Sequence, residues 1–198
     1  MDSDRPGFPA PSEDVELDAE MLATLSHPLR LRMLGRLRIH GPATATQLAR
    51  ELGESSGATS YHLRQLQAAG LVEEDPERGT RRERWWRSVH RRSWVHVGGD
   101  DESRAVGGAY LRAIARAYSE RILRYADSIE TAEEDYGKEW ADASTISDWK
   151  LELTAEQATE LEGEIREVIE RFDRSSRGVG ARTVVAQFQL LPLRYPEL

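Results

Sequence analysis

The segment that most constrains the fold of this chain is residues 44–72, TATQLARELGESSGATSYHLRQLQAAGLV. Its first part predicts a short helix, because Thr44 and Gln47 have the spacing of a capping box and apolar residues recur along one face. Gly53 can take the left-handed conformation that ends helices. A second helical pattern starts almost at once, so the segment predicts two short helices joined by a tight turn.

The second helix of this pair has one apolar side and one side of small and polar residues. Ser55 can cap its start, and Gly70 is suited to end it after about Ala69. Leu63 and Leu66 are expected to point inward. The opposite, solvent-facing side then holds Ser56, Gly57, Ser60, Tyr61 and Arg64.

The flanking sequence adds two helices before this pair and a β-hairpin after it. A helical period begins at Asp18, and Pro28 is suited to the first turn of a second helix that Gly41 and Pro42 end. After the pair, LVEED and RERWWRSV are interpreted as two strands that flank PERGTR, a turn that contains proline and glycine. The order is helix, helix, short helix, tight turn, helix, hairpin.

This order of elements is typical of a winged helix-turn-helix. We therefore expect a mainly α fold with a small β component, in which residues 17–97 form the winged helix-turn-helix domain. Residues 1–16 are rich in Pro, Asp, Ser and Gly, and we expect them to form a disordered tail. Residues 98–198 make up the rest of the chain.

Four strings between residues 21 and 92 add a family resemblance. They are LSHPLRLRMLGRL, TATQLARELG, ATSYHLRQLQAAGLV and the arginine-rich hairpin that ends in RWWRS, and the most specific part is S-x-H-L-x-x-L-x-x-A-G-L-V from Ser60 to Val72. Over about a third of its length, the chain resembles the ArsR-type family of bacterial transcriptional regulators. The resemblance implies that the helix carrying Ser60 enters the major groove of DNA. It also implies that the hairpin, or wing, lies along an adjacent minor groove or phosphate row.

The solvent-facing side of the second helix is the predicted DNA contact. Small side chains at Ser56, Gly57 and Ser60 let a helix backbone approach base edges closely, and Tyr61 and Arg64 reach further. Three alternatives stay open at this point. Ser56 could serve only as a helix cap, Ser60 could bond back to its own helix, and Tyr61 could pack at the rim of the core.

The predicted hairpin concentrates positive charge in an acidic protein. The chain has a net charge of −8, but residues 78–92 hold seven arginines and one glutamate. We expect these arginines to neutralise phosphates, which makes DNA binding steeply dependent on salt. The candidates are Arg78, Arg81, Arg82 and Arg84, of which Arg78 or Arg81 could enter a narrow minor groove. A helix front covered by its own chain, or guanidinium groups held by the chain's own carboxylates, would contradict this hypothesis.

From about Asp101 the sequence predicts a long helix with an apolar stripe. In ArsR-like regulators, helices that flank the winged domain form the dimer. We therefore expect a long dimerisation helix and a homodimer, with two recognition helices about one DNA turn apart on an imperfect palindromic operator. The alternative is a stripe that packs on the C-terminal region of the same chain. The stripe consists of Val106, Tyr110, Ala113, Ala117, Ile122, Tyr125 and Ile129.

The C-terminal residues predict a strand-helix-strand extension. STISDWKLELT and RTVVAQFQLLPL alternate like strands, and between them Thr154 and Gln157 have capping-box spacing ahead of an amphipathic helix. We expect residues 98–198 to serve dimerisation, and a small-molecule effector could bind there. The aromatic side chains that could line its pocket, or belong to the core instead, are Tyr118, Trp140, Trp149, Phe172 and Phe188.

Several classes of function find no support in the sequence. Cysteine is absent, which excludes disulfides, thiolate metal sites and cysteine nucleophiles. His62 is assigned mainly to packing, and His90 and His96 have no matching ligand pair, so we expect no metal and no cofactor. No phosphate-cradling glycine loop or nucleophile elbow appears, so we expect no catalytic residue and no enzyme. The chain has neither a membrane-helix window nor a signal-peptide pattern, so we expect a cytoplasmic protein without a membrane partner.

Together these features predict a sequence-specific DNA-binding transcriptional regulator, a dimeric repressor of the ArsR type without a cysteine metal site. Its expected partners are double-stranded DNA, a second copy of the chain and, where a signal is sensed, a small-molecule effector. The alternative is a winged-helix protein–protein interaction module without specific DNA binding. The arginine-rich hairpin favours DNA, because a winged helix that binds protein does not need to neutralise phosphates.

Overall fold

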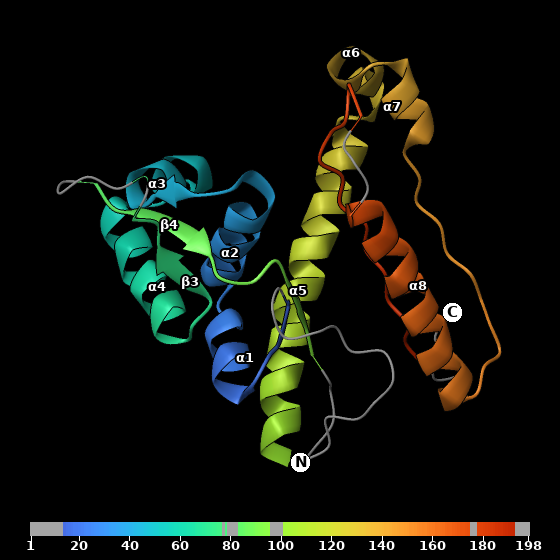
Figure 1. Ribbon diagram of the computed structural model, residues 1–198, viewed down its shortest axis with the longest axis horizontal. Coiled ribbons are helices and arrows are strands. Elements are labelled where there is room, and N and C mark those ends of the chain that lie inside the picture. Colours follow the sequence, from blue (N-terminus) through green and yellow to red (C-terminus); the bar gives the residue numbers. More distant parts are fainter. Residues whose placement is uncertain (1–13, 77, 79–82, 96–100, 175–177, 193–198) are drawn as a thin grey trace. The chain divides into compact units, whose positions relative to one another are not determined.

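The computed structural model divides the chain into two compact units (Figure 1). The larger unit is Ala10–Ser144, and the smaller consists of Met1–Pro9 and Thr145–Leu198. The expected domain boundary between residues 97 and 98 lies inside the larger unit.

No helix in the described part of the chain is long and apolar enough to span a membrane. The structure describes residues 14–76, 78, 83–95, 101–174 and 178–192.

Two helices open the larger unit, and both begin where the sequence predicts. Asp18 caps α1 (Ala19–Leu25) by accepting the backbone N–H of Met21 at 2.8 Å. α2 (Pro28–His40) carries its proline in the first turn, where the missing N–H costs no hydrogen bond. Gly41 ends α2 with a φ of 78°, a conformation that glycine takes without a steric penalty.

The third helix, α3 (Ala45–Leu52), starts with the predicted capping box. The Gln47 side-chain oxygen accepts the Thr44 N–H at 2.8 Å, and the Thr44 hydroxyl accepts the Gln47 N–H at 3.2 Å. Gly53 ends the helix in the left-handed conformation, with a φ of 72°. Both ends of this helix are therefore determined by residues that the sequence identifies.

The fourth helix, α4 (Ser56–Ala68), is the candidate recognition helix. Ser55 caps it by accepting the Ala58 N–H at 3.2 Å, and Gly70 follows it with a φ of 69°. Leu63 and Leu66 are fully buried, as predicted. The apolar side of α4 is thus fixed in the core, which leaves the other side facing outward.

A three-stranded antiparallel sheet follows, in the order β2–β4–β3. β3 (Val72–Glu74) and β4 (Trp85–Ser88) form the predicted hairpin, with Glu73 opposite Arg87. The other edge of β4 pairs with β2 (Ala43–Thr44), a strand too short to show an alternating pattern in the sequence. Helices and sheet together form a winged helix-turn-helix.

A second small sheet corrects the expected N-terminal tail. β1 (Asp14–Glu16) pairs in parallel with β5 (Arg92–Trp94), so residues 14–16 are not disordered. Val15 packs against the core, and the following Leu17 is buried. The composition of the tail could not reveal this pairing, because the partner strand lies far along the chain. Residues 1–13 of the expected tail lie outside the described residues.

The predicted long helix is α5 (Asp101–Asp127), and part of its stripe packs inside the larger unit. Tyr110 and Ala113 are buried, and α5 packs against α1 and α2. Tyr110 belongs to the same core as Leu34 and Leu37 of α2, and its burial raises the pKa of its hydroxyl to about 12. This part of α5 is therefore integral to the winged unit.

The later part of α5 is exposed, with Ile122 at 44% and Leu123 at 61%. Three short helical elements complete the larger unit. They are η1 (Ile129–Thr131), α6 (Ala132–Tyr136) and α7 (Lys138–Ala143).

The smaller unit contains the predicted amphipathic helix, α8 (Ala155–Arg174), behind the predicted capping box. The two expected flanking strands do not form: residues 144–154 and 181–192 have no regular secondary structure. The prediction of a strand-helix-strand extension is therefore wrong for both strands. Alternation leads to a strand only where a second strand can pair with it, and Trp149 and Val184 remain exposed instead of covering a core.

Candidate nucleic-acid interface

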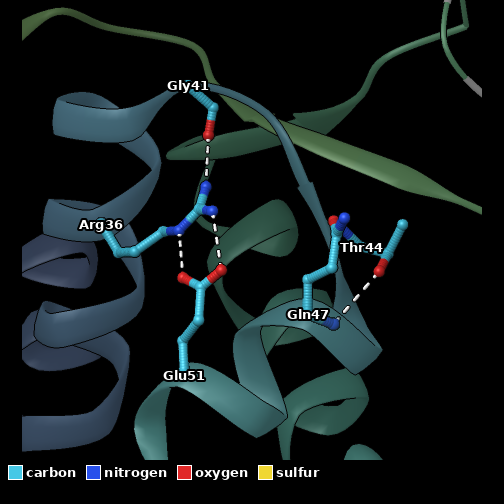
Figure 2. A network of polar contacts seen from close by, with 5 residues as sticks. All are labelled: Arg36, Gly41, Thr44, Gln47 and Glu51. Atoms are coloured by element: carbon cyan, nitrogen blue, oxygen red, sulfur yellow. Dashed lines mark hydrogen bonds and ion pairs between the residues drawn. The ribbon is translucent and has the colours of Figure 1, made fainter.

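Arg36 holds α3 against α2 and thereby positions the first helix of the turn pair. Its guanidinium donates to Glu51 Oε2 at 2.6 Å and Oε1 at 3.0 Å, and to the Gly41 carbonyl at 2.8 Å. Figure 2 shows this network beside the Thr44–Gln47 capping box. The hydrogen bonds from Arg36 lower the pKa of the Glu51 carboxyl. Arg36 is therefore a structural residue, although its charge alone would suit a phosphate contact.

The outward side of α4 carries the five residues that the sequence places there. Tyr61 is 54% exposed, Ser60 is half-buried and the other three are exposed. Arg64 forms no ion pair with a described residue. The described part of the chain thus leaves the front of α4 open. The five residues are Ser56, Gly57, Ser60, Tyr61 and Arg64.

Local geometry settles the capping alternative for Ser56 and describes the surroundings of Gly57 and Tyr61. The helix cap is Ser55, so capping does not explain Ser56. At Gly57 an added Cβ would meet nothing within 4 Å, and the backbone φ is not positive. The fold therefore does not require glycine at position 57. Tyr61 touches the ring of His62 edge-on at 5.2 Å between centroids, but more than half of its surface stays open.

A contact between two imidazole rings joins α4 to the start of α2. The ring centroids of His27 and His62 lie 4.5 Å apart. Burial lowers the pKa of both imidazoles, and the positive charge of Arg30 lowers both further. The packing role assigned to His62 from the sequence did not identify this partner, because no local spacing relates two residues so far apart in the chain.

The described hairpin arginines, unlike Arg64 on the front of α4, lie beside carboxylates. Each of the three described ones lies beside a carboxylate of the same hairpin, whereas Arg81 and Arg82 lie outside the described residues. The pairs are Arg78 with Asp75 at 3.6 Å, Arg84 with Glu74 at 3.0 Å and Arg87 with Glu73 at 2.8 Å.

These pairs correct the expected charge of the wing. Residues 72–88 contain five arginines and five acidic residues, so the hairpin as a whole is balanced. The strongly positive count over residues 78–92 omits the acidic first strand, which the antiparallel register brings opposite the second. The expected concentration of positive charge is therefore wrong for the described part of the hairpin. The pairs of Arg84 and Arg87 are exposed on both sides, and such pairs contribute only about 0–1 kcal/mol, so a phosphate can still compete with their carboxylates.

The two tryptophans of β4 point to opposite faces, as strand geometry requires. Trp86 is 4% exposed and anchors the hairpin in the core. Trp85 is half-buried on the other face, with the guanidinium carbon of Arg78 6.0 Å from its ring centroid. Arg78 is thus placed by both a carboxylate and an aromatic ring.

Comparison with known proteins gives this geometry a family context. Residues 25–75, from the end of α1 to the hairpin, match the family model described as "Helix-turn-helix domain". The chain contains a helix-turn-helix domain. In DNA-binding domains of this kind the second helix lies in the major groove, and the corresponding helix in this chain is α4. The match covers about a quarter of the chain and leaves α5 and the smaller unit outside it.

One solved structure with a likeness to this chain is that of transcriptional regulator Tm0710 from Thermotoga maritima. The two chains are 17% identical, with a TM-score of 0.30 over 76% of this chain and 80% of the other. No curated protein matches the sequence. Among the described residues, no three His, Cys, Asp or Glu side chains are grouped so that they could hold a metal ion.

Proposed function

We propose that the protein is a sequence-specific DNA-binding transcriptional regulator, a dimeric repressor of the ArsR type without a cysteine metal site. The observation that carries the proposal is the open front of α4 within a helix-turn-helix domain. Ser56, Gly57 and Ser60 allow the helix to approach base edges closely, and Tyr61 and Arg64 reach further along the groove. Occupation of promoter DNA is sufficient for repression.

The hairpin supplies phosphate contacts in this proposal. Its candidates remain Arg78, Arg81, Arg82 and Arg84. The side chains of Arg78 and Arg84 are 58% and 69% exposed, so both guanidinium groups are open to a phosphate. These contacts fix the orientation of the protein on the duplex and carry no sequence information.

The proposed homodimer uses the later part of α5. Ile122 and Leu123 are exposed there, and Ile129 of η1 is 56% exposed. A two-fold dimer pairs identical surfaces and would present two copies of α4 to an imperfect palindromic operator. Residues 98–198 would supply this contact, and an effector that binds there would release the DNA.

Selection of bound fragments from random duplex DNA, at two salt concentrations, tests the proposal. We expect an enriched motif with two-fold symmetry, and fewer recovered fragments at the higher salt concentration because phosphate contacts release counterions. Recovery without an enriched motif would contradict sequence-specific binding.

Two variants separate the roles of helix and hairpin. Arg81→Ala combined with Arg82→Ala is expected to weaken binding to all duplexes and to flatten the dependence of log affinity on log salt by about 0.9 per lost contact. Tyr61→Ala is expected to change the preference between sequences instead. Equal losses on all duplexes for both variants would contradict the assigned roles.

The charge balance of the hairpin favours a second candidate, a winged-helix module that binds another protein. Such a module has no need of unpaired arginines, and the three described hairpin arginines all lie beside carboxylates. The selection experiment distinguishes the two, since a protein-binding module would recover no enriched DNA motif.

A further inference from the structure

Neighbouring carboxylates of β3 lie against arginines on both faces of the hairpin. Successive residues of a strand point to opposite faces, so Glu73 and Glu74 lie on different sides. Glu73 pairs with Arg87 directly opposite it, and Glu74 pairs diagonally with Arg84, two residues before its cross-strand neighbour Trp86. Each face of the hairpin therefore carries an arginine that a β3 carboxylate neutralises.

Both pairs are open to solvent and can exchange partners. The side chains of Arg84 and Glu74 are 69% and 43% exposed, and those of Arg87 and Glu73 are 47% and 46% exposed. A phosphate oxygen can therefore reach either guanidinium. It then competes with a carboxylate that accepts one N–H of that guanidinium, and the carboxylate repels it.

We propose that Glu73 and Glu74 set the affinity of the hairpin for DNA by competing with phosphate for Arg87 and Arg84. This inference rests on the proposed function. A phosphate that approaches either arginine therefore meets a β3 carboxylate beside it. Breaking an exposed ion pair of this kind weakens binding about two- to fivefold, and the carboxylate left beside the phosphate weakens it further.

The test uses the full chain with Glu73→Gln and Glu74→Gln combined. Glutamine keeps the shape of the side chain and one acceptor oxygen but removes the negative charge. Fluorescence anisotropy with a labelled random-sequence duplex should give about five- to twentyfold tighter binding than the native chain at about 0.1 M salt. The matched control combines Glu133→Gln and Glu134→Gln, two adjacent exposed glutamates of α6. Its affinity should stay within about twofold of the native value.

A second background shows whether the glutamates act through the arginines. With Arg84→Gln and Arg87→Gln in place, removing both glutamate charges should bring no more gain than the α6 control. An undiminished gain in this background would mean that the glutamates act by general repulsion of DNA, and it would overturn the proposal. So would an affinity equal to that of the α6 control in the native background.

Two further measurements keep the outcome decisive. Thermal unfolding followed by circular dichroism checks that the double variant folds, and the single variants Glu73→Gln and Glu74→Gln give the comparison if it does not. A native chain that fails to bind any duplex would contradict the proposed function itself. Native binding that the glutamine variants leave unchanged would contradict only the competition by Glu73 and Glu74.

Discussion

At the scale of single residues, Gly57 separates what folding needs from what binding needs. Glycine inside a helix costs about 0.5–1 kcal/mol relative to alanine, because it loses more conformational freedom on folding. The surroundings of Gly57 have room for a methyl group, and its backbone does not demand glycine. The fold therefore does not account for glycine at this exposed position, whereas the proposed approach of α4 to DNA would.

Gly57→Ala is accordingly expected to change stability and binding in opposite directions. The free energy of unfolding should rise by about 0.5–1 kcal/mol, measured by urea denaturation. Affinity for the selected operator should fall about tenfold, since one well-placed base contact is worth about 1–3 kcal/mol. Gly35→Ala is the control, because Gly35 lies in α2 with equally open surroundings. It should raise stability without weakening DNA binding, and a loss of affinity there would discredit the interpretation of Gly57.

The contact between the His27 and His62 imidazoles predicts a loss of stability in mild acid. The pKa of His27 and of His62 lies below 6.5 in the folded chain, because burial disfavours the charged form. The unfolded chain therefore binds more protons than the folded chain once the pH falls below about 6.5. Stability should be full above that pH and should fall as the pH drops through the two lowered pKa values.

Urea midpoints at pH 7.5 and pH 5.5 measure this loss directly. Replacing both His27 and His62 with Gln should remove most of the difference between the two midpoints. An unchanged difference in the glutamine variant would assign the pH dependence to other groups.

At the scale of elements, a bidentate ion pair between Arg36 and Glu51 joins α2 to α3. Glu51→Gln is expected to lower the free energy of unfolding by about 1 kcal/mol, a modest loss because the Glu51 side chain is 36% exposed. Asp142→Asn is the comparison, since Asp142 pairs with Lys138 at 2.9 Å on an exposed surface. That change should cost less than about 0.5 kcal/mol. Equal losses in chemical denaturation would mean that the Arg36–Glu51 bridge contributes no more than a surface pair.

The elements that the sequence predicts well are those whose ends are set locally. The Thr44–Gln47 box, the Ser55 cap and the glycines after α3 and α4 act within one helical turn, so their spacing is visible in the sequence. The strands predicted in the smaller unit do not form, because an alternating segment becomes a strand only where another strand pairs with it, and local sequence does not reveal the partner. β1 was missed because its partner β5 lies far along the chain.

In the candidate site, too, features set by local spacing could be predicted from the sequence, and features set by distant partners could not. The outward face of α4 follows from helical periodicity, which placed Ser56, Gly57 and Tyr61 correctly at the surface. The ion pairs of the wing do not follow from periodicity, because the register of the hairpin brings the β3 carboxylates beside Arg84 and Arg87. A charge count over contiguous residues cannot include acids that folding brings from the opposite strand.

At the scale of the whole molecule, the exposed apolar residues of α5 predict a surface that joins two copies. Ile122→Arg combined with Leu123→Arg should convert a dimer to a monomer in sedimentation at micromolar concentration, because it places two like charges per subunit in the contact. Arg substitution at Ile146, which is 72% exposed in the smaller unit, should leave the dimer intact. A native chain that sediments as a monomer would contradict the proposed dimer.

The burial of Tyr110 beside Leu34 and Leu37 has a mechanical consequence. It places α5 and the helix-turn-helix around one shared core. In a dimer built on α5, the distance between the two α4 helices would then depend on the angle at which the two α5 helices cross. An effector that weakens DNA binding by such a dimer would change that crossing angle, and with it the spacing of the two winged domains, without altering the fold of either domain.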